Sequence, residues 1–509
     1  MDRTGSVVRN FKFTAASELI LALLKFVSRR VFVLLLGKEY LGLNGLFTDI
    51  LSVLALVELG FGVSITYSLY RPAARGEEGL IRSLIRLCRR VYWGVGLVIL
   101  VLGLSLTPAL PFFVKEMPEG IPDIPLIYIL NVINVSVSYL FSYKATLLFV
   151  YQKKYIDAMI RALVMLLFTG AQIGVLFLTG NYLYYLCLAI AATLVQNMAV
   201  SVKTDRLYPY LRKKETAPLP TEVKREIGRN VGAMLLNRIG AVVVFGTDNI
   251  LISKFVGVVT TGLYSNYIMI RNFLNTMINT LFGAITPALG HLNATESAEN
   301  RRKAFRNLNF FAAWLSGWLS ICLLWLYDAF INLWLGEGYL LPRPVVLLIV
   351  ANFYVGSMRV PVANTRSVMG LFWDERYKSI LEALLNLALS VLLGQRWGIA
   401  GIIAGTLIST LALPFWIEPL GLYRYGLKQQ AGEYFGHYLI HLLVTIAAGG
   451  LTGFLCALTG RGIAGFALKA ALCIVVPNLA YAAVYCRREE FCFLEELMGR
   501  LYKRVRGKE

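Results

Sequence analysis

The sequence predicts an all-α polytopic membrane protein with about fourteen transmembrane helices. Its 509 residues are 57% hydrophobic and only 16% charged, with a mean hydropathy of +0.63, whereas soluble domains are about 45–50% apolar and about 25% charged. The apolar residues also form runs of about 20 residues, the length that a helix needs to cross a bilayer. The predicted spans are residues 13–36, 43–70, 91–114, 125–150, 158–180, 182–202, 231–256, 262–290, 308–332, 344–369, 378–394, 398–420, 437–460 and 462–486.

The distribution of Lys and Arg predicts the orientation of these spans. With the N-terminus inside, eight alternate segments hold 35 of the 50 Lys and Arg residues, and the opposite loops hold six. Cytoplasmic loops carry such an excess of positive charge, so we expect both termini in the cytoplasm. Contact of these loops with anionic membrane lipid accounts for the net charge of +20 without a nucleic-acid partner.

The chain repeats itself at an offset of about 220 residues. Gly37 and Gly42, after the first span, return as Gly257 and Gly262 after the seventh. Six spans per repeat give both halves the same orientation, so we expect an axis along the membrane normal and a binding site between the halves. The predicted parts are an N-terminal bundle, a basic cytoplasmic linker, a second bundle, two extra helices and a basic cytoplasmic tail, at residues 1–202, 203–230, 231–420, 437–486 and 487–509.

Positive charge within the spans is the feature that points to a function. Each cation at the centre of a membrane helix costs roughly 2.5–3.5 kcal/mol on insertion scales. Lys25 and Arg29 share one helix face, and Arg359 and Arg366 are seven residues apart, so we expect these polar faces to line a shared wet cavity. Lys469 is expected to reach the outer surface with its long side chain. The predicted binding residues are Lys25, Arg29, Arg30, Lys144, Arg238, Arg271, Arg359 and Arg366.

Structural roles compete with binding for some of these residues. The first two spans form a hairpin that brings Arg30 and Asp49 to the same depth, where they would form an ion pair. No acid lies near Lys144, Arg359 or Arg366 in the sequence. The repeat places Asp248 opposite residue 28, so we predict that Asp248 pairs with Arg29 or Arg30 and closes the outer side of the cavity.

A cationic cavity predicts an anionic ligand. Arginine binds phosphate oxygens in pairs and stays charged, which favours a phosphate or diphosphate group. A drug or cation exporter would line its cavity with carboxylates instead. His437 and His441 lie four residues apart but lack a third ligand, so neither a metal nor a cofactor is expected.

The stretch "LGKEYLGLNGLFTDILSVLALVELGFG" at 36–62, followed by "SITYSLYRP" at 64–72, resembles the first two spans of bacterial polysaccharide (Wzx-type) flippases. These belong to the multidrug/oligosaccharidyl-lipid/polysaccharide (MOP) exporter superfamily. The resemblance implies two pseudo-symmetric six-helix bundles around a central cavity, plus two C-terminal helices, in the bacterial cytoplasmic membrane. By helix position, the diphosphate-binding residues that it implies are Arg29, Arg238, Arg271 and Arg366.

The resemblance also implies a transporter, which moves undecaprenyl-diphosphate-linked oligosaccharide from the cytoplasmic to the outer leaflet by alternating access. A polysaccharide polymerase and glycosyltransferases are candidate partners. Lipid II flippases have a similar basic cavity and are the nearest alternative, and a drug/cation antiporter of the same superfamily is the second. An enzyme is disfavoured, because the outside loops at 115–124 and 333–343 are too short for a catalytic domain.

Overall fold

The computed structural model describes residues 3–58, 61–118, 120–213, 218–223, 225, 227, 228, 231, 246–371, 377–460 and 462–492. All regular secondary structure in these ranges is helical. Apolar runs in a bilayer favour this outcome, because a helix satisfies its backbone hydrogen bonds within one segment and hydrocarbon offers none. The chain divides into two compact units, Met1–Ser265 and Asn266–Glu509, which we call the N-terminal unit and the C-terminal unit.

Within the described ranges, nine helical segments are long and apolar enough to cross a membrane, judged by length and composition. They are Glu78–Ser105, Ile124–Ser142, Lys154–Thr179, Tyr182–Leu207, Ala298–Leu335, Arg343–Val368, Lys378–Leu427, Gly432–Ala457 and Gly462–Tyr485. The class of all-helical polytopic membrane protein is therefore confirmed. The number of fourteen spans stays a prediction.

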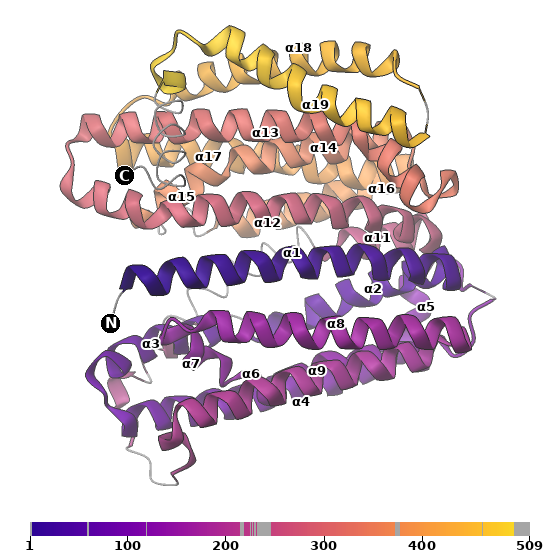
Figure 1. Cartoon of the computed structure of the whole chain (residues 1–509), viewed down its shortest axis with the longest axis vertical. Helices are drawn as coiled ribbons and strands as arrows, with labels where there is room; N and C mark the ends of the chain where they lie inside the picture. Colours follow the sequence, from indigo (N-terminus) through magenta and orange to yellow (C-terminus); the bar gives the residue numbers. More distant parts are fainter. Residues whose placement is uncertain are drawn as a thin grey trace. The chain divides into compact units, whose positions relative to one another are not determined.

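Long helices lying side by side build the N-terminal unit. Its helices are α1 (Arg3–Leu36), α2 (Lys38–Leu54), α3 (Phe61–Arg75), α4 (Glu78–Ser105), α5 (Leu110–Phe113), α6 (Ile124–Ser142), α7 (Ala145–Val150), α8 (Lys154–Thr179), α9 (Tyr182–Leu207) and α11 (Asp248–Phe255), with 3₁₀ turns η1 (Ala55–Glu58), η2 (Thr107–Ala109) and η3 (Pro209–Arg212). Helix α12 (Val258–Thr295) begins in this unit and continues into the next. Helix α1 packs on α8, and α6 packs on both α4 and α9 (Figure 1).

Two predicted spans of this unit are broken helices. The 3₁₀ turn η1 lies between α2 and α3, and two residues separate the end of α6 from the start of α7. These breaks place Glu58 and Lys144 at helix ends. Backbone groups at a helix end lack a hydrogen-bond partner within the helix. Side chains of α3, α4 and α7 pack together in one hydrophobic cluster, in which Leu84, Cys88 and Leu147 are fully buried.

The C-terminal unit is built around α13. Its helices are α13 (Ala298–Leu335), α14 (Arg343–Met358), α15 (Val360–Val368), α16 (Lys378–Ala412), α17 (Pro414–Gly421), α18 (Gly432–Ala457) and α19 (Gly462–Tyr485), with a 3₁₀ turn η4 (Glu337–Tyr339) and a π-helical turn η6 (Leu422–Leu427). Helix α13 packs on α14, α18 and α19 (Figure 1). Its tryptophans hold the two last helices, because Trp325 donates to Gly449 O at 2.9 Å and Trp314 to Asn478 Oδ1 at 2.6 Å.

Helix α16 is a helical hairpin. Gly398 has φ 56° and ψ −135°, which interrupts the helical path. The legs on either side of it run antiparallel, since Ser390 Oγ donates to Ile402 O at 3.1 Å and Asn386 Nδ2 to Thr406 Oγ1 at 3.0 Å. The predicted spans 378–394 and 398–420 therefore fall on the two legs of one hairpin.

His441 lies in the contact between α18 and α19. His441 is buried, and its Nδ1 is 2.7 Å from Tyr485 Oη. Among the described residues, no three His, Cys, Asp or Glu side chains come together in a way that could hold a metal ion. His441 is thus part of the packing of this helix pair.

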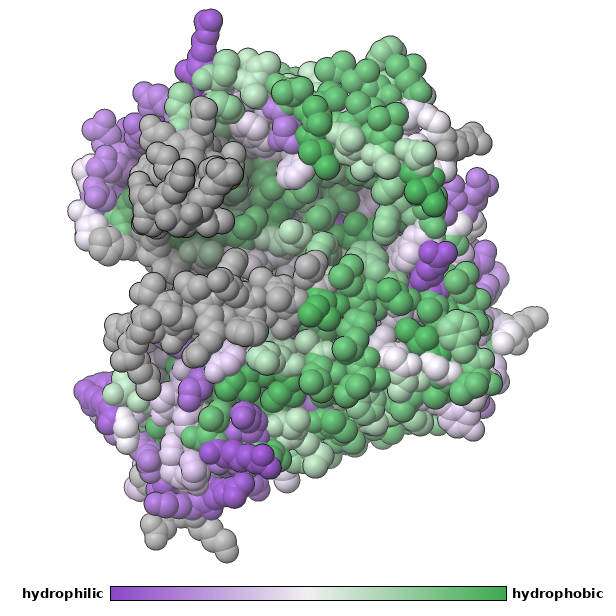
Figure 2. All heavy atoms as spheres, in the orientation of Figure 1, coloured by the Kyte–Doolittle hydropathy of each residue, from purple (hydrophilic) through white to green (hydrophobic). Residues whose placement is uncertain are grey.

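Surface hydropathy agrees with a membrane protein. Figure 2 shows hydrophobic side chains over the middle of the helices and hydrophilic ones gathered toward the helix ends in both units. Apolar side chains exposed over a band of this kind contact lipid rather than water.

The described part of the predicted linker packs on the N-terminal unit. Tyr208 stacks on Tyr151 with ring centroids 4.7 Å apart, and the Tyr151 and Tyr210 hydroxyls are 3.3 Å apart. Ser64 Oγ donates to Ile227 O at 3.2 Å. The division of two bundles at 203–230 stays a prediction, and the compact units meet in the sequence at residue 265.

Candidate functional site

The three cations of α1 differ in their surroundings. Arg29 is half-buried, and its Nη1 donates a hydrogen bond to Ser265 Oγ at 3.0 Å, which ties α1 to the first turns of α12. Lys25 and Arg30 are exposed. None of the three forms an ion pair with a residue that the structure describes. Helix α1 therefore carries uncompensated positive charge along a predicted span.

Arg30 lies on a different face of α1 from Arg29. Successive residues of a helix are about 100° apart, so Arg30 shares its face with Leu23, Val27 and Leu34. These three side chains are 59%, 55% and 64% exposed. Only Lys25 and Arg29 keep the shared polar face that the sequence predicted.

The predicted partners of the α1 cations have other contacts. Asp248 begins α11, is buried, and accepts a hydrogen bond from Tyr264 Oη at 3.1 Å. Asp49 lies half-buried in α2. Among the described residues, neither Asp49 with Arg30 nor Asp248 with Arg29 or Arg30 forms an ion pair. In this structure Arg29 bonds Ser265 and Asp248 bonds Tyr264, and the gate expected when the outer side is closed stays a prediction.

Two repeat-related glycines bring α2 and α12 into backbone contact. A β-carbon built on Gly42 would lie 1.9 Å from Val258 O, and one on Gly262 would lie 2.5 Å from Lys38 O. Residues 38 and 258 are themselves separated by the repeat offset of 220. The two contacts are therefore equivalent under the repeat, and only a residue without a side chain permits them.

A glycine with positive φ precedes each of these helices. Gly37 and Gly257 precede α2 and α12, with φ of 90° and 132°. Residues with side chains rarely adopt this region, whereas glycine does so readily. The repeat seen in the sequence thus has a structural counterpart at its glycines.

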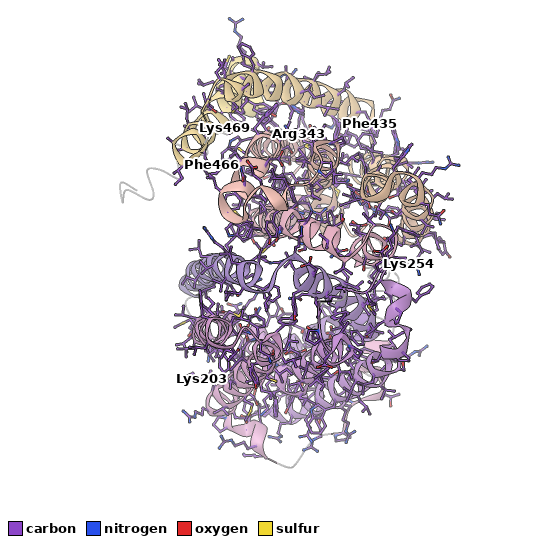
Figure 3. The ribbon with its side chains drawn as sticks, turned by 90° about the vertical axis from the view of Figure 1, so that its right-hand side faces the viewer. Lys203, Lys254, Arg343, Phe435, Phe466 and Lys469 are labelled. Atoms are coloured by element: carbon purple, nitrogen blue, oxygen red, sulfur yellow. The ribbon has the colours of Figure 1, made fainter. Side chains whose placement is uncertain are left out.

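Two cations of the predicted outer loops have local partners (Figure 3). In the N-terminal unit, Lys254 Nζ donates to Phe112 O at 2.5 Å and lies 3.8 Å from the centre of the Phe112 ring. In the C-terminal unit, Arg343 Nη1 is 3.2 Å from Asp328 Oδ2 and donates to Leu324 O at 2.9 Å. Both cations therefore make local contacts near helix ends. The candidate binding residues are the cations within the predicted spans.

Lys144 has an acidic partner that the sequence did not reveal. Its Nζ is 2.7 Å from Asp205 Oδ2, and the two side chains are only 16% and 19% exposed. Asp205 lies 61 residues away, near the end of α9. The expectation that no acid compensates Lys144 is therefore wrong, because α7 and α9 pack together.

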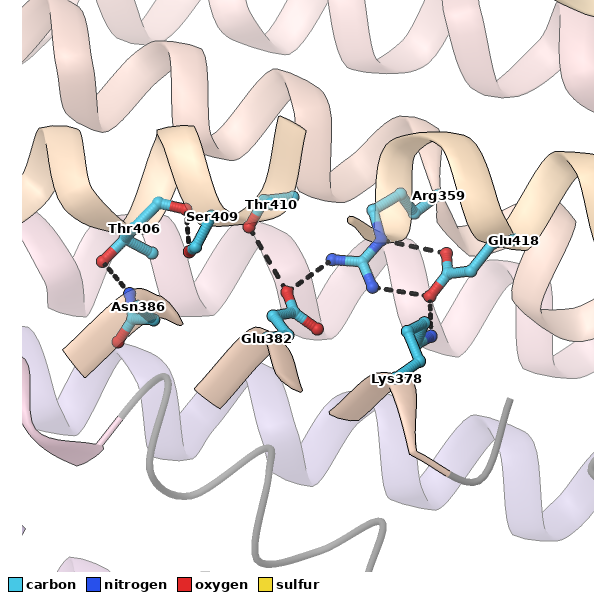
Figure 4. A network of polar contacts seen from close by, with 8 residues as sticks. All are labelled: Arg359, Lys378, Glu382, Asn386, Thr406, Ser409, Thr410 and Glu418. Carbon is cyan, nitrogen blue, oxygen red and sulfur yellow. Dashed lines mark hydrogen bonds and ion pairs between the residues drawn. The ribbon is translucent and has the colours of Figure 1, made fainter. Parts of the chain in front are cut away.

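Arg359 lies in a buried ion-pair network of the C-terminal unit (Figure 4). It stands between α14 and α15, and its Nε and Nη2 donate to Glu418 Oε2 at 3.0 Å and Oε1 at 2.6 Å. Its Nη1 lies 3.6 Å from Glu382 Oε1. Lys378, the first residue of α16, also bonds Glu418 Oε1. We call Arg359, Lys378, Glu382 and Glu418 the Arg359 network.

Among the described residues, the Arg359 network contains as many cations as carboxylates. Its two cations face two carboxylates, and Arg359 meets Glu418 in the paired geometry that is strong for arginine. The expectation that Arg359 is uncompensated is therefore wrong. Because breaking one partner of a buried pair leaves an unpaired charge, the network holds α15, α16 and α17 together at helix ends.

Two more predicted cations lie in the C-terminal unit. Arg271 is half-buried in α12, and its Nε is buried with no hydrogen-bond partner among the described residues. The same helix exposes Asn272, Thr276 and Asn279. Polar side chains exposed along a predicted span indicate that this face of the helix contacts water rather than lipid.

Arg366 is buried in the last turn of α15, where its Nη2 donates to Leu371 O at 2.9 Å. This bond closes the carbonyl end of the helix, a common place for arginine. Arg238 lies outside the described residues.

Sequence reasoning missed the acids that compensate the cations. Glu382 and Glu418 stand out in the sequence as acids within apolar runs, which was the available signal. Asp205 gave none, because it lies in a charged segment after a span. Asp205 is 61 residues from Lys144, and Glu418 is 59 residues from Arg359. Only the packing of helices brings these partners together.

Comparison with solved structures gives the class of protein. The lipid II flippase MurJ in an inward closed conformation matches with a TM-score of 0.62 at 13% identity, covering 93% of this chain and 98% of that one. An inward-facing multidrug resistance MATE family transporter of the MOP superfamily matches with 0.57 at 14%, covering 82% and 98%. The MATE transporter VcmN of Vibrio cholerae matches with 0.56 at 13%, covering 83% and 98%. This chain therefore has the fold of MOP-superfamily membrane transporters.

The family follows from the sequence. The model of the family described as "Polysaccharide biosynthesis protein" matches residues 7–293, more than half of the chain. The chain belongs to this polysaccharide biosynthesis family. A comparison with curated proteins gave no significant match.

Proposed function

We propose that this protein is a flippase for a lipid-linked oligosaccharide diphosphate. It moves undecaprenyl-diphosphate-linked oligosaccharide from the cytoplasmic to the outer leaflet by alternating access of two bundles around a cationic cavity. Membership of the polysaccharide biosynthesis family supports a lipid-linked sugar as substrate. The fold of MOP-superfamily transporters supports transport across the membrane.

The uncompensated cations of α1 are the observation that carries this proposal. Lys25, Arg29 and Arg30 lie in one predicted span and form no ion pair with any described residue. At roughly 2.5–3.5 kcal/mol each, the charges of Lys25 and Arg29, which share one helix face, cost a membrane helix roughly 5–7 kcal/mol on insertion scales. A transported diphosphate brings the negative charge that offsets this cost while it is bound.

The proposal includes the topology expected from the sequence. It has fourteen spans, bundles at 1–202 and 231–420, extra helices at 437–486, and both termini in the cytoplasm. Of the predicted binding residues, Lys25, Arg29, Arg271 and Arg366 remain candidates for the diphosphate, with Arg30 and Arg238 as further ones. Lys144 and Arg359 contribute to the site only if their acidic partners release them.

The experiment is complementation of a bacterial strain that lacks its own polysaccharide flippase. Arg29→Ala should reach normal membrane levels but lose most surface glycan, because a charge-assisted hydrogen bond contributes about 1.5–3 kcal/mol, tenfold or more in binding. Arg29→Lys should recover export only in part, since a point charge does not replace the planar fork. Arg396→Ala, at an exposed arginine by the α16 turn, is the matched control. Normal export by Arg29→Ala would remove Arg29 from the site.

A lipid II flippase is the second candidate. The structural similarity to MurJ over 93% of this chain favours it. Growth of a strain depleted of its lipid II flippase, restored by this chain without any surface glycan, would establish this alternative. A drug/cation antiporter would instead change the drug-resistance profile of the host.

A further inference from the structure

The N-terminal unit contains a polar cavity whose described lining residues include none of the predicted cations. Its volume is about 450 Å³, within the range of about 300–1,000 Å³ that is usual for small-molecule sites. Helices α4, α6, α7 and α9 and the turn η1 form its walls. The lining residues are Glu58, Tyr92, Ser138, Tyr139, Ser142, Ala145, Thr146, Thr193, Gln196 and Asn197.

Many of the described lining residues carry hydroxyl or amide groups. Of the ten lining residues that the structure describes, nine carry a polar group and none carries a positive charge. The carboxylate among these ten is Glu58, whose Oε1 accepts a hydrogen bond from Tyr92 Oη at 3.3 Å. The rings of Tyr92 and Tyr139 lie edge to face, with centroids 5.9 Å apart and planes at 89°. Polar groups of this density inside membrane helices are costly and indicate a binding function.

Several polar atoms of the cavity are available to a ligand. Asn197 Nδ2 donates to Ser138 O at 2.9 Å, which fixes the amide and leaves its oxygen with no described partner. The Gln196 amide and the Tyr139 hydroxyl have no hydrogen-bond partner within the described ranges. The cavity therefore offers both donors and acceptors on a framework that other bonds hold in place.

The chemistry of the walls excludes most ligand classes. Among the described lining residues, a diphosphate finds no cation to pair with. A metal ion would find one carboxylate among the lining residues, fewer than hard cations require. An apolar drug would leave the hydroxyl and amide groups without partners. A sugar fits, because its hydroxyls both donate and accept, and its ring carbons pack against tyrosine rings.

We propose that this cavity binds one uncharged sugar unit of the transported glycolipid. The inference rests on the proposed function, since it divides one substrate between two sites. The diphosphate binds the cations of the spans, and a sugar residue binds between α4, α6 and α9. Gln196 bonds a sugar hydroxyl, and Tyr139 contributes its ring and its hydroxyl.

A site of this kind selects among glycans. A pocket built to bond a hydroxyl rejects analogues that lack it much more strongly than an apolar pocket rejects a missing methylene, because its own polar groups are left unpaired. The cavity therefore determines which sugar is carried, whereas the cations recognise what all such lipids share.

The test is binding of free sugars to the full-length protein in lipid nanodiscs, by saturation-transfer NMR. The probes are glucose, galactose, rhamnose and N-acetylglucosamine, with inorganic pyrophosphate as a separate probe. At least one sugar should bind to the unmodified protein. Tyr139→Phe and Gln196→Ala should each weaken that binding about threefold to tenfold, as expected for one hydrogen bond, and leave pyrophosphate binding unchanged. Tyr184→Phe, an exposed tyrosine outside the cavity, should match the unmodified protein.

Export in the complemented strain separates the two proposals. Sugar binding together with failure of the unmodified chain to export glycan would refute the flippase function and leave a sugar site. Export without binding of any probe sugar would overturn this inference and leave the function standing. Equal binding by Tyr139→Phe, Gln196→Ala and Tyr184→Phe would also overturn it, because the sugar would then bind elsewhere.

Discussion

The glycine contact between α2 and α12 gives the sharpest prediction. In Gly42→Ala, the new β-carbon would lie 1.9 Å from the backbone oxygen of Val258, a distance that real β-carbons do not show. Backbone cannot swing aside as a side chain can, so the two helices must separate by more than 1 Å to restore an ordinary contact of about 3.4 Å. Overpacking of this kind costs typically about 1–3 kcal/mol.

Separation of α2 and α12 relieves that strain. If this contact closes the outer side of the transporter, Gly42→Ala shifts the population toward the outward-open state by about fivefold to 150-fold. A cysteine at Val33, whose native side chain is 1% exposed, should then react faster with an impermeant maleimide in intact cells. The seven native cysteines are replaced beforehand. Gly262→Ala should act in the same direction but more weakly, since its β-carbon would lie 2.5 Å from Lys38 O.

The control lies on the same helix. A β-carbon on Gly45 would meet nothing nearer than 3.7 Å, so Gly45→Ala introduces the same methyl group without a clash. It should leave labelling at Val33 unchanged. Equal labelling rates for Gly42→Ala and Gly45→Ala would refute the reasoning, because the glycine contact would then have no part in closing the outer side.

Three further predictions concern charge and topology. Arg359→Ala should lower the thermal midpoint of the purified protein far more than Arg30→Ala does, because it leaves the buried carboxylates of Glu382 and Glu418 with Lys378 as the remaining cation of the Arg359 network, at a cost of about 3–5 kcal/mol; equal midpoints would show that the Arg359 network is not structural. If Lys144 serves only to pair Asp205, the loss of stability in Lys144→Ala should shrink when Asp205→Ala is added, with a coupling of about 0.5–3 kcal/mol in a thermal double-mutant cycle, and additive losses would contradict the pair. Glu337 and Glu77 are both exposed. A cysteine that replaces Glu337 should react with an impermeant thiol reagent in intact cells, and one that replaces Glu77 should not. The reverse pattern would invert the proposed orientation.

Helix positions followed from the sequence because they depend on local composition. Predicted spans such as 182–202 and 462–486 fall on α9 and α19 within a few residues. The bilayer allows only one solution for an apolar run of this length, so hydropathy alone is informative. Breaks within spans were harder to predict. The interruptions at Lys144 and Arg359 lie where these side chains meet acids of other helices. Local composition does not reveal such contacts.

The sequence by itself determined three features, since each depends only on the order of residues along the chain. They are the membership of a membrane transporter family, the repeat at offset 220 and the paired glycines of that repeat. Which charges remain free was decided by the tertiary structure. Arg359 and Glu418 meet across 59 residues, as do Lys144 and Asp205 across 61, while Arg29 bonds Ser265 across 236. A charge inside a membrane is stabilised by whatever group packing brings within a few ångströms, and sequence separation carries no information about that distance.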